Sequence, residues 1–240
     1  MTFGTLYLIP VTLGDDNIAQ NIHHVIPPNV VAIAQKLEYF VVESEKSARR
    51  FLSAIKTAKP VRELTLNLLN EHTQDKDIAA LLAPLLQGQD VGLMSDAGCP
   101  GVADPGAKLV ALAHQKNIKV VPFVGPSSIL LALMASGLNG QQFAFLGYLP
   151  VDKAQRAQKL KEIEKRAQTH NETQIFIETP YRNMHMLEAL LSTCSAKTRL
   201  CIASQVSLSD EMIVTKTING WKKSTLPDLH KKPTVFLLLA

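Results

Sequence analysis

The residues best placed to do chemistry in this chain form one loop, Ser95-Asp-Ala-Gly-Cys-Pro-Gly-Val-Ala-Asp-Pro-Gly106, directly after the apolar run Val91–Met94. The loop contains three glycines and two prolines. Glycine tolerates positive φ and proline fixes φ at about −65°, so the path of the loop is specified while few side chains cover its backbone. A ligand can therefore reach main-chain N–H and C=O groups. The loop predicts recognition of a neutral or zwitterionic molecule by peptide groups.

Other segments that end strand-like runs are candidates to meet the same ligand, namely Pro10, Gly125-Pro-Ser-Ser128 and Glu178-Thr-Pro-Tyr-Arg182. The common signatures of nucleotide and hydrolase sites are absent from the sequence. No Gly-x-Gly-x-x-Gly follows a strand-like run, and neither a P-loop nor a Gly-x-Ser-x-Gly motif occurs. The histidines and cysteines lack metal-ligand spacing, so we expect no metal site.

Short apolar runs alternate with helical patterns in the first half, which is typical of a parallel α/β sheet. The predicted strands cover residues 6–9, 39–42, 64–67, 91–94 and 119–123, and the predicted helices cover residues 48–58, 77–86, 107–116 and 128–136. The glycine-rich loop then lies between the carboxyl end of a strand and a helix, where open α/β sheets bind ligands. We expect Asp104 to be the N-cap of that helix and Pro105 its first residue.

The second half has a different pattern. Its predicted strands cover residues 143–146, 174–177, 199–203, 212–215 and 234–238, with only about two substantial helices between them. Because parallel neighbours need crossover connections, so few helices favour a mixed α+β sheet. We therefore expect a parallel α/β domain over residues 1–138 and a mixed α+β domain over residues 139–240, with Gly137–Gly140 as the hinge.

The composition indicates a folded protein with a mildly basic surface. The 240 residues are 46% hydrophobic and 19% charged, and the net charge is +4. The longest apolar stretch, Ile129–Ala135, is far shorter than the roughly 20 residues that span a bilayer, and an odd number of cysteines fits a reducing compartment. We expect a cytoplasmic protein with no membrane or metal partner. Cations gather over residues 153–166, which predicts either a solvated helix face or a surface for phosphate groups.

Four segments carry a family resemblance: Gly4-Thr-Leu-Tyr-Leu-Ile9, the loop Ser95–Gly106, Gly125–Ser128 and Phe145-Leu-Gly-Tyr-Leu-Pro150. Together they resemble the tetrapyrrole methylase superfamily of S-adenosylmethionine-dependent methyltransferases. Within it the chain is most similar to the rRNA small subunit methyltransferase I family, which methylates a cytidine ribose 2′-hydroxyl. The resemblance runs from Gly4 to the last predicted strand and implies the two-domain tetrapyrrole methylase fold.

The resemblance also implies a homodimer whose protomers bind S-adenosylmethionine between two domains. Carried over by position, the cofactor-binding residues of the first half, with the loop that follows it, are Pro10, Gly98, Cys99, Val102, Ala103, Ser127 and Ser128. Those of the second half are Ile177, Glu178, Val206, Pro233 and Thr234. Several also have a purely structural interpretation, since Pro10 can stop a strand, Val102 and Ile177 can belong to the core, and Ser127 can cap a helix.

Methyl transfer to a ribose hydroxyl needs a group that takes the hydroxyl proton, because that hydroxyl is a weak nucleophile at neutral pH. The resemblance makes Glu43, His72 and Glu178 the candidate bases, in no fixed order. Arg182 is the fourth candidate catalytic residue, and with Lys46 it would hold an acceptor phosphate or stabilise a developing alkoxide. A salt bridge between Glu178 and Arg182 with a structural role is an equal alternative.

Two segments depart from the pattern of the ribose methylases. Where that family reads Ala-Thr-Pro-Ile-Gly-Asn, this chain reads Pro10-Val-Thr-Leu-Gly-Asp15, and where it reads Ala-Glu-Asp-Thr-Arg, this chain reads Val42-Glu-Ser-Glu-Lys46. Both segments face the acceptor in the family, so the acceptor stays open. Ribosomal RNA is the expected substrate and partner. The alternatives are methylation of a tetrapyrrole or other small molecule, and a paralogue that binds the cofactor without acting on rRNA.

Overall fold

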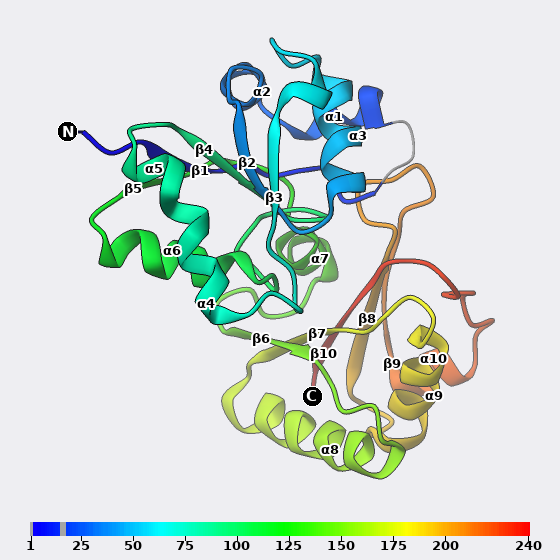
Figure 1. Cartoon of the computed structure of the whole chain (residues 1–240). Coiled ribbons are helices and arrows are strands. Elements are labelled where there is room, and N and C mark those ends of the chain that lie inside the picture. Colours follow the sequence, from blue (N-terminus) through cyan, green and yellow to red (C-terminus); the bar gives the residue numbers. More distant parts are fainter. Residues whose placement is uncertain (1, 15–17) are drawn as a thin grey trace. The chain divides into compact units, whose positions relative to one another are not determined.

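The structure is a computed structural model that describes residues 2–14 and 18–240. Asp15, which ends the first divergent segment, lies outside the described residues. The chain divides into two compact units, Met1–Ser127 and Ser128–Ala240, and each contains a five-stranded sheet. Figure 1 shows the helices and strands of both units. The expected two-domain organisation of a parallel and a mixed sheet is confirmed.

The first unit contains a fully parallel sheet with the strand order β3-β2-β4-β1-β5. Its strands are β1 (Thr5–Leu8), β2 (Tyr39–Val42), β3 (Thr65–Leu68), β4 (Val91–Met94) and β5 (Lys119–Pro122). Strand β4 is buried along its whole length, as expected of a strand that helices cover on both faces. Because β1 and β4 are paired in parallel, their carboxyl ends lie side by side at one edge of the sheet.

Two apolar cores fill the two faces of this sheet. Ile9 and Phe40 belong to one core, whereas Leu6 and Leu93 belong to the other, because successive side chains of a strand point to opposite faces. The first core is closed by α1 (Ile18–Val25), α2 (Pro28–Ala34) and α3 (Glu45–Ile55). The second is closed by α4 (Asp75–Ile78), η2 (Ala79–Leu82), α5 (Ala83–Leu86) and α6 (Gly106–Gln115). A 3₁₀ turn, η1 (Val61–Glu63), precedes β3.

The sheet of the second unit has the order β6-β7-β10-β8-β9. Only β6 and β7 are parallel neighbours, and all other pairs are antiparallel. The strands are β6 (Phe143–Tyr148), β7 (Thr173–Ile177), β8 (Arg199–Ser204), β9 (Met212–Thr217) and β10 (Thr234–Leu239). The last strand in the sequence therefore occupies the middle of the sheet.

Helices cover both faces of this second sheet. Phe176, Phe236 and Trp221 belong to a core that is closed by α8 (Lys153–His170), α9 (Asn183–Thr193) and α10 (Ile218–Lys222). Helix α7 (Ser128–Ser136) packs against the opposite face, where the Thr215 hydroxyl of β9 donates to the carbonyl oxygen of Ser136 at 2.6 Å.

Nearly all predicted strands are present within two residues of their expected ends. The helices α1 and α2, between β1 and β2, were not predicted from the sequence. The predicted helix over residues 77–86 is three short pieces, α4, η2 and α5, with Pro84 at the start of the third. The contact division falls before α7, so this helix packs with the second unit, whereas the sequence placed the boundary after it at Gly137–Gly140.

Replacing Gly92 with alanine is expected to destabilise the first unit. A Cβ there would lie 2.7 Å from Cδ1 of both Ile9 and Phe40, which are fully buried. Overpacking of this kind costs about 1–3 kcal/mol. Urea unfolding of Gly92→Ala would measure it. The matched control is Gly140→Ala, whose Cβ meets nothing within 4 Å and should change stability by no more than about 0.5 kcal/mol. Equal stability of the two variants would contradict the packing described here.

Candidate functional site

The glycine-rich loop of the first unit begins at the carboxyl end of β4, beside the end of β1. The chain leaves β1 toward β2, which lies beyond β4, and leaves β4 toward β5, which lies beyond β1. Connections that depart in opposite directions from neighbouring strands mark the place where open α/β sheets bind ligands. The sequence therefore positions the loop at the sheet edge where ligand binding is expected.

Three strand-end segments are tied together at this edge. The main-chain N–H of Val11 donates to the carbonyl oxygen of Gly98 at 2.9 Å. The Cys99 thiol donates to the carbonyl oxygen of Pro126 at 3.4 Å, and burial raises the pKa of that thiol, which keeps it protonated as a donor. A Cβ on Gly125 would lie 2.2 Å from Cβ of Pro10. Contacts this close leave no room for larger side chains where the segments cross.

The loop owes its shape to left-handed backbone and one carboxylate. Gly98, Gly101 and Ala103 have φ of +71°, +81° and +57°. The Asp104 carboxylate accepts hydrogen bonds from the N–H groups of Gly101 at 2.8 Å and Gly106 at 2.6 Å. Burial raises the pKa of Asp104, while these two hydrogen bonds lower it. The helix begins at Gly106 after Pro105, so Asp104 lies one residue before the N-cap position predicted for it, yet its carboxylate still binds the N–H of Gly106.

Part of this loop presents its backbone to solvent. The side chain of Val102 is half exposed and Ala103 is exposed. Across residues 2–14 and 18–240, no group accepts a hydrogen bond from the main-chain N–H of Val102 or Ala103. Val102 is therefore not a core residue, and the loop offers main-chain donors, as its composition predicted.

Glu43 lies next to the loop, at the carboxyl end of β2. Its Oε2 accepts a hydrogen bond from the main-chain N–H of Asp96 at 2.9 Å, and its own N–H donates to the carbonyl oxygen of Met94 at 3.2 Å. Partial burial raises the pKa of Glu43, the Asp96 N–H lowers it, and the nearby charges of Asp96 and Asp104 raise it again. A carboxylate with a raised pKa is a stronger base than an ordinary glutamate, which suits it to proton transfer.

The candidate residues of the second unit gather at one edge of its sheet. Thr234 begins β10 opposite Ser204, the last residue of β8, and Val235 pairs with Ile177, the last residue of β7. The N–H of Gln205 donates to the carbonyl oxygen of Pro233 at 2.9 Å. Because β10 is antiparallel to both neighbours, its start meets their ends. Ile177, Glu178, Val206, Pro233 and Thr234 thus lie together, as expected from the resemblance.

Glu178 is the most enclosed acidic group of this edge. Its side chain is only 1% exposed, and Oε1 accepts hydrogen bonds from Thr179 N–H at 2.6 Å and from Arg182 Nη2 at 2.7 Å. Its Oε2 is buried and has no hydrogen-bond partner among the described residues. An unpaired buried carboxylate oxygen is costly, so it is positioned to accept a hydrogen bond from a ligand.

Two further observations bear on the predicted residues. The side chain of His72 is 82% exposed, 3.6 Å from the Glu71 carboxylate, and touches none of the other candidates. Asn183 was not predicted: it is fully buried, and its amide donates to the carbonyl oxygen of Lys232 at 2.7 Å, which fixes the segment before Thr234. Its position two residues after the Pro-Tyr pair of a strand-end loop gave no sequence signal of this role.

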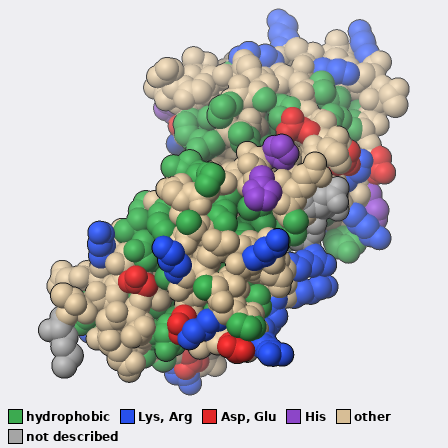
Figure 2. Space-filling view, turned by 90° about the horizontal axis from the view of Figure 1, so that it is seen from above, with side chains coloured by type: hydrophobic (Ala, Val, Ile, Leu, Met, Phe, Trp, Pro, Cys, Tyr) green, Lys and Arg blue, Asp and Glu red, His purple; other side chains and the backbone are tan. Residues whose placement is uncertain are grey.

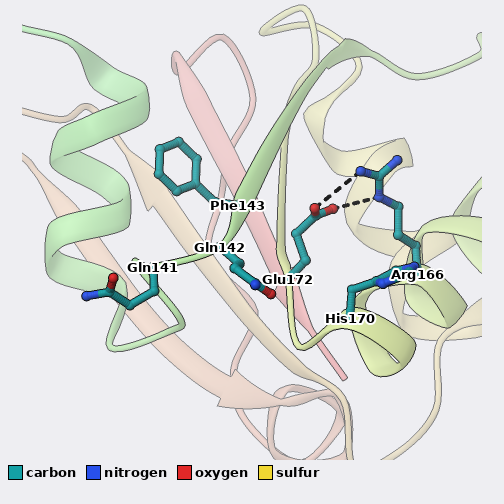
Figure 3. A pocket seen from close by; sticks show the side chains of 6 residues that line it. All are labelled: Gln141, Gln142, Phe143, Arg166, His170 and Glu172. Carbon is teal, nitrogen blue, oxygen red and sulfur yellow. Dashed lines mark hydrogen bonds and ion pairs between the residues drawn. The ribbon is translucent and has the colours of Figure 1, made fainter.

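A pocket of about 420 Å³ lies away from these residues, at the amino ends of β6 and β7. Figure 3 shows its lining, with the side chains of Glu172 and Arg166 turned toward each other. Arg166 Nε lies 2.6 Å from Glu172 Oε1, and this hydrogen bond lowers the pKa of Glu172. Because Glu178 follows the opposite end of β7, this pocket is separate from the candidate site. The other lining residues are Gln141, Gln142, Phe143 and His170.

Two kinds of site were searched for and not found in the described part of the chain. No group of three or more His, Cys, Asp or Glu side chains could hold a metal ion. No helix among the described residues is both long and apolar enough to cross a membrane.

Comparison with known proteins decides the family. A family profile described as Tetrapyrrole (Corrin/Porphyrin) Methylases matches residues 6–220. The chain belongs to the tetrapyrrole methylase family. It is accordingly a methyltransferase, and the match includes every loop of the candidate site except Pro233 and Thr234.

Curated tetrapyrrole methylase relatives align with most of the chain. The "Ribosomal RNA small subunit methyltransferase I" of Vibrio cholerae is 29% identical over 208 residues, which cover 87% of this chain and 67% of that protein. The protein of the same name from Pasteurella multocida is 30% identical over 212 residues, which cover 88% of this chain and 69% of that protein.

A solved structure confirms the tetrapyrrole methylase fold. The crystal structure of the methyltransferase CobJ superposes with a TM-score of 0.64 at 18% identity, and covers 100% of this chain and 94% of CobJ. At this identity the likeness concerns the fold alone.

The raised pKa of Glu43 predicts a pH dependence of stability. The fold favours the neutral carboxyl, so this contribution is fully present below the unfolded-state pKa and is lost as the pH rises through the raised folded-state pKa. Glu43→Gln keeps an oxygen that can accept the Asp96 N–H and removes the titration. In urea unfolding between about pH 4 and pH 7, wild-type stability should fall relative to the variant as the pH rises. A difference that changes in the opposite direction would contradict this.

Proposed function

We propose that this tetrapyrrole methylase uses S-adenosylmethionine to methylate a ribose 2′-hydroxyl of small-subunit ribosomal RNA. The observation that carries the proposal is that relatives from several bacteria, named as small-subunit rRNA methyltransferases, align with 85–94% of this chain at 28–30% identity. The arrangement of the strand-end loops supports it, because they offer main-chain donors beside a carboxylate with a raised pKa.

The groups of the first unit fit a cofactor of this kind. Val102 and Ala103 offer main-chain N–H groups to an uncharged heterocycle, and Gly98 has no side chain where three segments cross. We assign the binding surface of this unit to these residues together with Pro10, Cys99 and Ser127.

The second unit supplies oxygen acceptors and hydroxyls. The unpaired Oε2 of Glu178 is suited to accept from a ribose hydroxyl or an ammonium group, and Thr234 carries a hydroxyl next to it in the sheet edge. Ile177, Val206 and Pro233 give apolar surface at the same edge. We assign these residues and Ser128, the first residue of α7, to the cofactor.

When bound, S-adenosylmethionine supplies an electrophilic methyl carbon on a positively charged sulfur. The protein must hold the acceptor hydroxyl in line with that carbon, exclude water and accept the hydroxyl proton. Among the three candidate bases, Glu43 is favoured, because its raised pKa and its hydrogen bond to Asp96 place a basic carboxylate beside the loop. Glu178 is committed to Arg182 and Thr179, and His72 is exposed at the end of the edge strand β3.

Arg182 has two roles in this proposal. It neutralises the buried carboxylate of Glu178, and about a third of its side chain stays exposed to meet an acceptor phosphate. Removing it leaves Glu178 buried without its cation, so Arg182→Ala should weaken the second unit as well as methyl transfer. Arg182→Lys keeps the charge and loses the forked geometry.

The proposed function is tested by turnover. Small ribosomal subunits from a strain that lacks this protein would be incubated with it and labelled S-adenosylmethionine, and modified riboses would be mapped. We expect one labelled ribose, and Glu43→Gln should slow its formation by about 10²–10⁴-fold. Methylation of a tetrapyrrole but not of the subunits would assign a different acceptor. Cofactor binding without turnover on either would support a protein that only binds the cofactor.

Replacing Gly98 with alanine is expected to weaken cofactor binding by about tenfold or more. Its Cβ would lie 3.1 Å from Leu13 Cδ2 and 3.2 Å from the carbonyl oxygen of Pro126, and would separate the segments that form the surface. Calorimetry with S-adenosylmethionine measures the effect. Gly101→Ala is the matched control, since its φ is also positive but its nearest Cβ contact is 4.0 Å away. Equal affinities of the two variants would remove Gly98 from the proposed surface.

We further propose that the protein acts in the cytoplasm as a homodimer. Helix α7 is apolar on every side, which is typical of a helix buried all round. Its residues Leu130 and Met134, one turn apart, are nevertheless 50% and 79% exposed. Light scattering should give a dimer for the wild type and a monomer for Leu130→Asp with Met134→Asp. A monomeric wild type at micromolar concentration would contradict the proposal.

A further inference from the structure

The outer face of α3 carries a basic groove. A hollow of about 550 Å³ is lined by three cationic side chains, Lys46, Arg49 and Arg50, and by the small residues Ser53 and Ala54. The buried residues of the helix, including Phe51 and Leu52, lie on its other side. Figure 2 looks onto the molecule from above and shows Lys and Arg side chains gathered on the visible face, with carboxylates between some of them.

The charges in the groove are not equally available. Arg49 is paired with Glu45 at 3.0 Å and also donates to the carbonyl oxygen of Val61 at 3.5 Å, so it is held in place by its neighbours. No ion pair or hydrogen bond is made by the Lys46 ammonium within the described parts of the chain. Lys46 and Arg50 are both exposed and lie four residues apart, which places them on the same side of the helix.

The groove begins next to the proposed base. Ser44 caps α3 by accepting from the N–H of Ser47, and Glu43 directly precedes it. Lys46 follows Glu43 by three residues, which is about 4.5 Å along a helix axis. A chain of phosphate groups lying along α3 would therefore lead toward the Glu43 carboxylate.

The basic segment over residues 153–166 is a weaker candidate for phosphate contact than its sequence indicated. Arg156 is buried and donates to the carbonyl oxygen of Val151. Arg166 is paired with Glu172, and Lys159 lies 3.4 Å from Glu162. These cations are occupied within the second unit.

We propose that the groove of Lys46, Arg49, Arg50 and Ser53 binds the phosphate backbone of the RNA strand that carries the methyl acceptor. This rests on the proposed function, which makes RNA the substrate. Lys46 and Arg50 neutralise phosphates, and the Ser53 hydroxyl is a further donor. The contact is sequence-independent, so it aligns the strand while other groups select the nucleotide.

The test compares two pairs of exposed cations. Lys46→Gln with Arg50→Gln removes two charges from α3, and Lys161→Gln with Lys165→Gln removes two exposed charges from α8 as the matched control. Binding of small-subunit rRNA from the deletion strain is followed by fluorescence anisotropy at several salt concentrations. Each phosphate contact in a single strand contributes about 0.7 to the slope of log K against log salt. The α3 pair should lower that slope by about 1.4, and the α8 pair should leave it near the wild-type value.

Calorimetry with S-adenosylmethionine and turnover separate the two levels of the argument. The α3 pair should bind the cofactor like the wild type and lose turnover through a higher KM for RNA. An α3 pair with the wild-type slope, beside a wild type that methylates the RNA, overturns the groove and leaves the proposed function standing. A wild type that neither binds nor methylates the RNA overturns both. A lower slope only in the α8 pair moves the phosphate contact to that helix.

Discussion

The candidate site of the first unit depends on one backbone crossing, where the N–H of Val11 meets the carbonyl oxygen of Gly98. This hydrogen bond ties the exit of β1 to the exit of β4 and forces the loop between Ser95 and Gly106 to turn with positive φ. Glycine is required at Gly98 because both the backbone conformation and the nearby Leu13 and Pro126 exclude a side chain. The exposed peptide groups that follow exist because the crossing holds them outward.

Charge is arranged around this crossing so that carboxylates approach one another. Glu43, Asp96 and Asp104 each raise the pKa of at least one of the others, and burial acts in the same direction. The main-chain donors of Asp96, Gly101 and Gly106 offset part of that repulsion. A basic carboxylate and the loop's geometry therefore come from the same few hydrogen bonds. Binding and proton transfer cannot be altered independently at this edge.

Much of this architecture could be predicted from the sequence, for identifiable reasons. Strands such as Val91–Met94 are short apolar runs ended by glycine or proline, so their positions and the parallel first sheet followed directly. The helices α1 and α2 were missed. Isolated pieces such as α4 and η2 cannot be distinguished from one helix by periodicity, because the apolar spacing continues through both.

The candidate site was predicted less completely than the fold. The gathering of Glu178, Pro233 and Thr234 depends on β10 entering antiparallel between β7 and β8, which strand patterns alone do not specify. The family resemblance supplied those residues. The partners that occupy Arg156, Arg166 and Lys159 are also invisible in a count of charges, and for that reason the basic helix seemed a better phosphate surface than it is.

The central place of β10 also constrains how the second unit is assembled during synthesis. Strands β6 to β9 leave the ribosome first, yet β7 and β8 are not paired with each other and each waits for β10 to complete its ladder. Until Thr234–Leu239 emerges, two apolar strands present open edges, which are templates for wrong pairing with other chains. Folding of this unit is therefore late and all at once, whereas the first unit has every strand it needs before half of the second has been made.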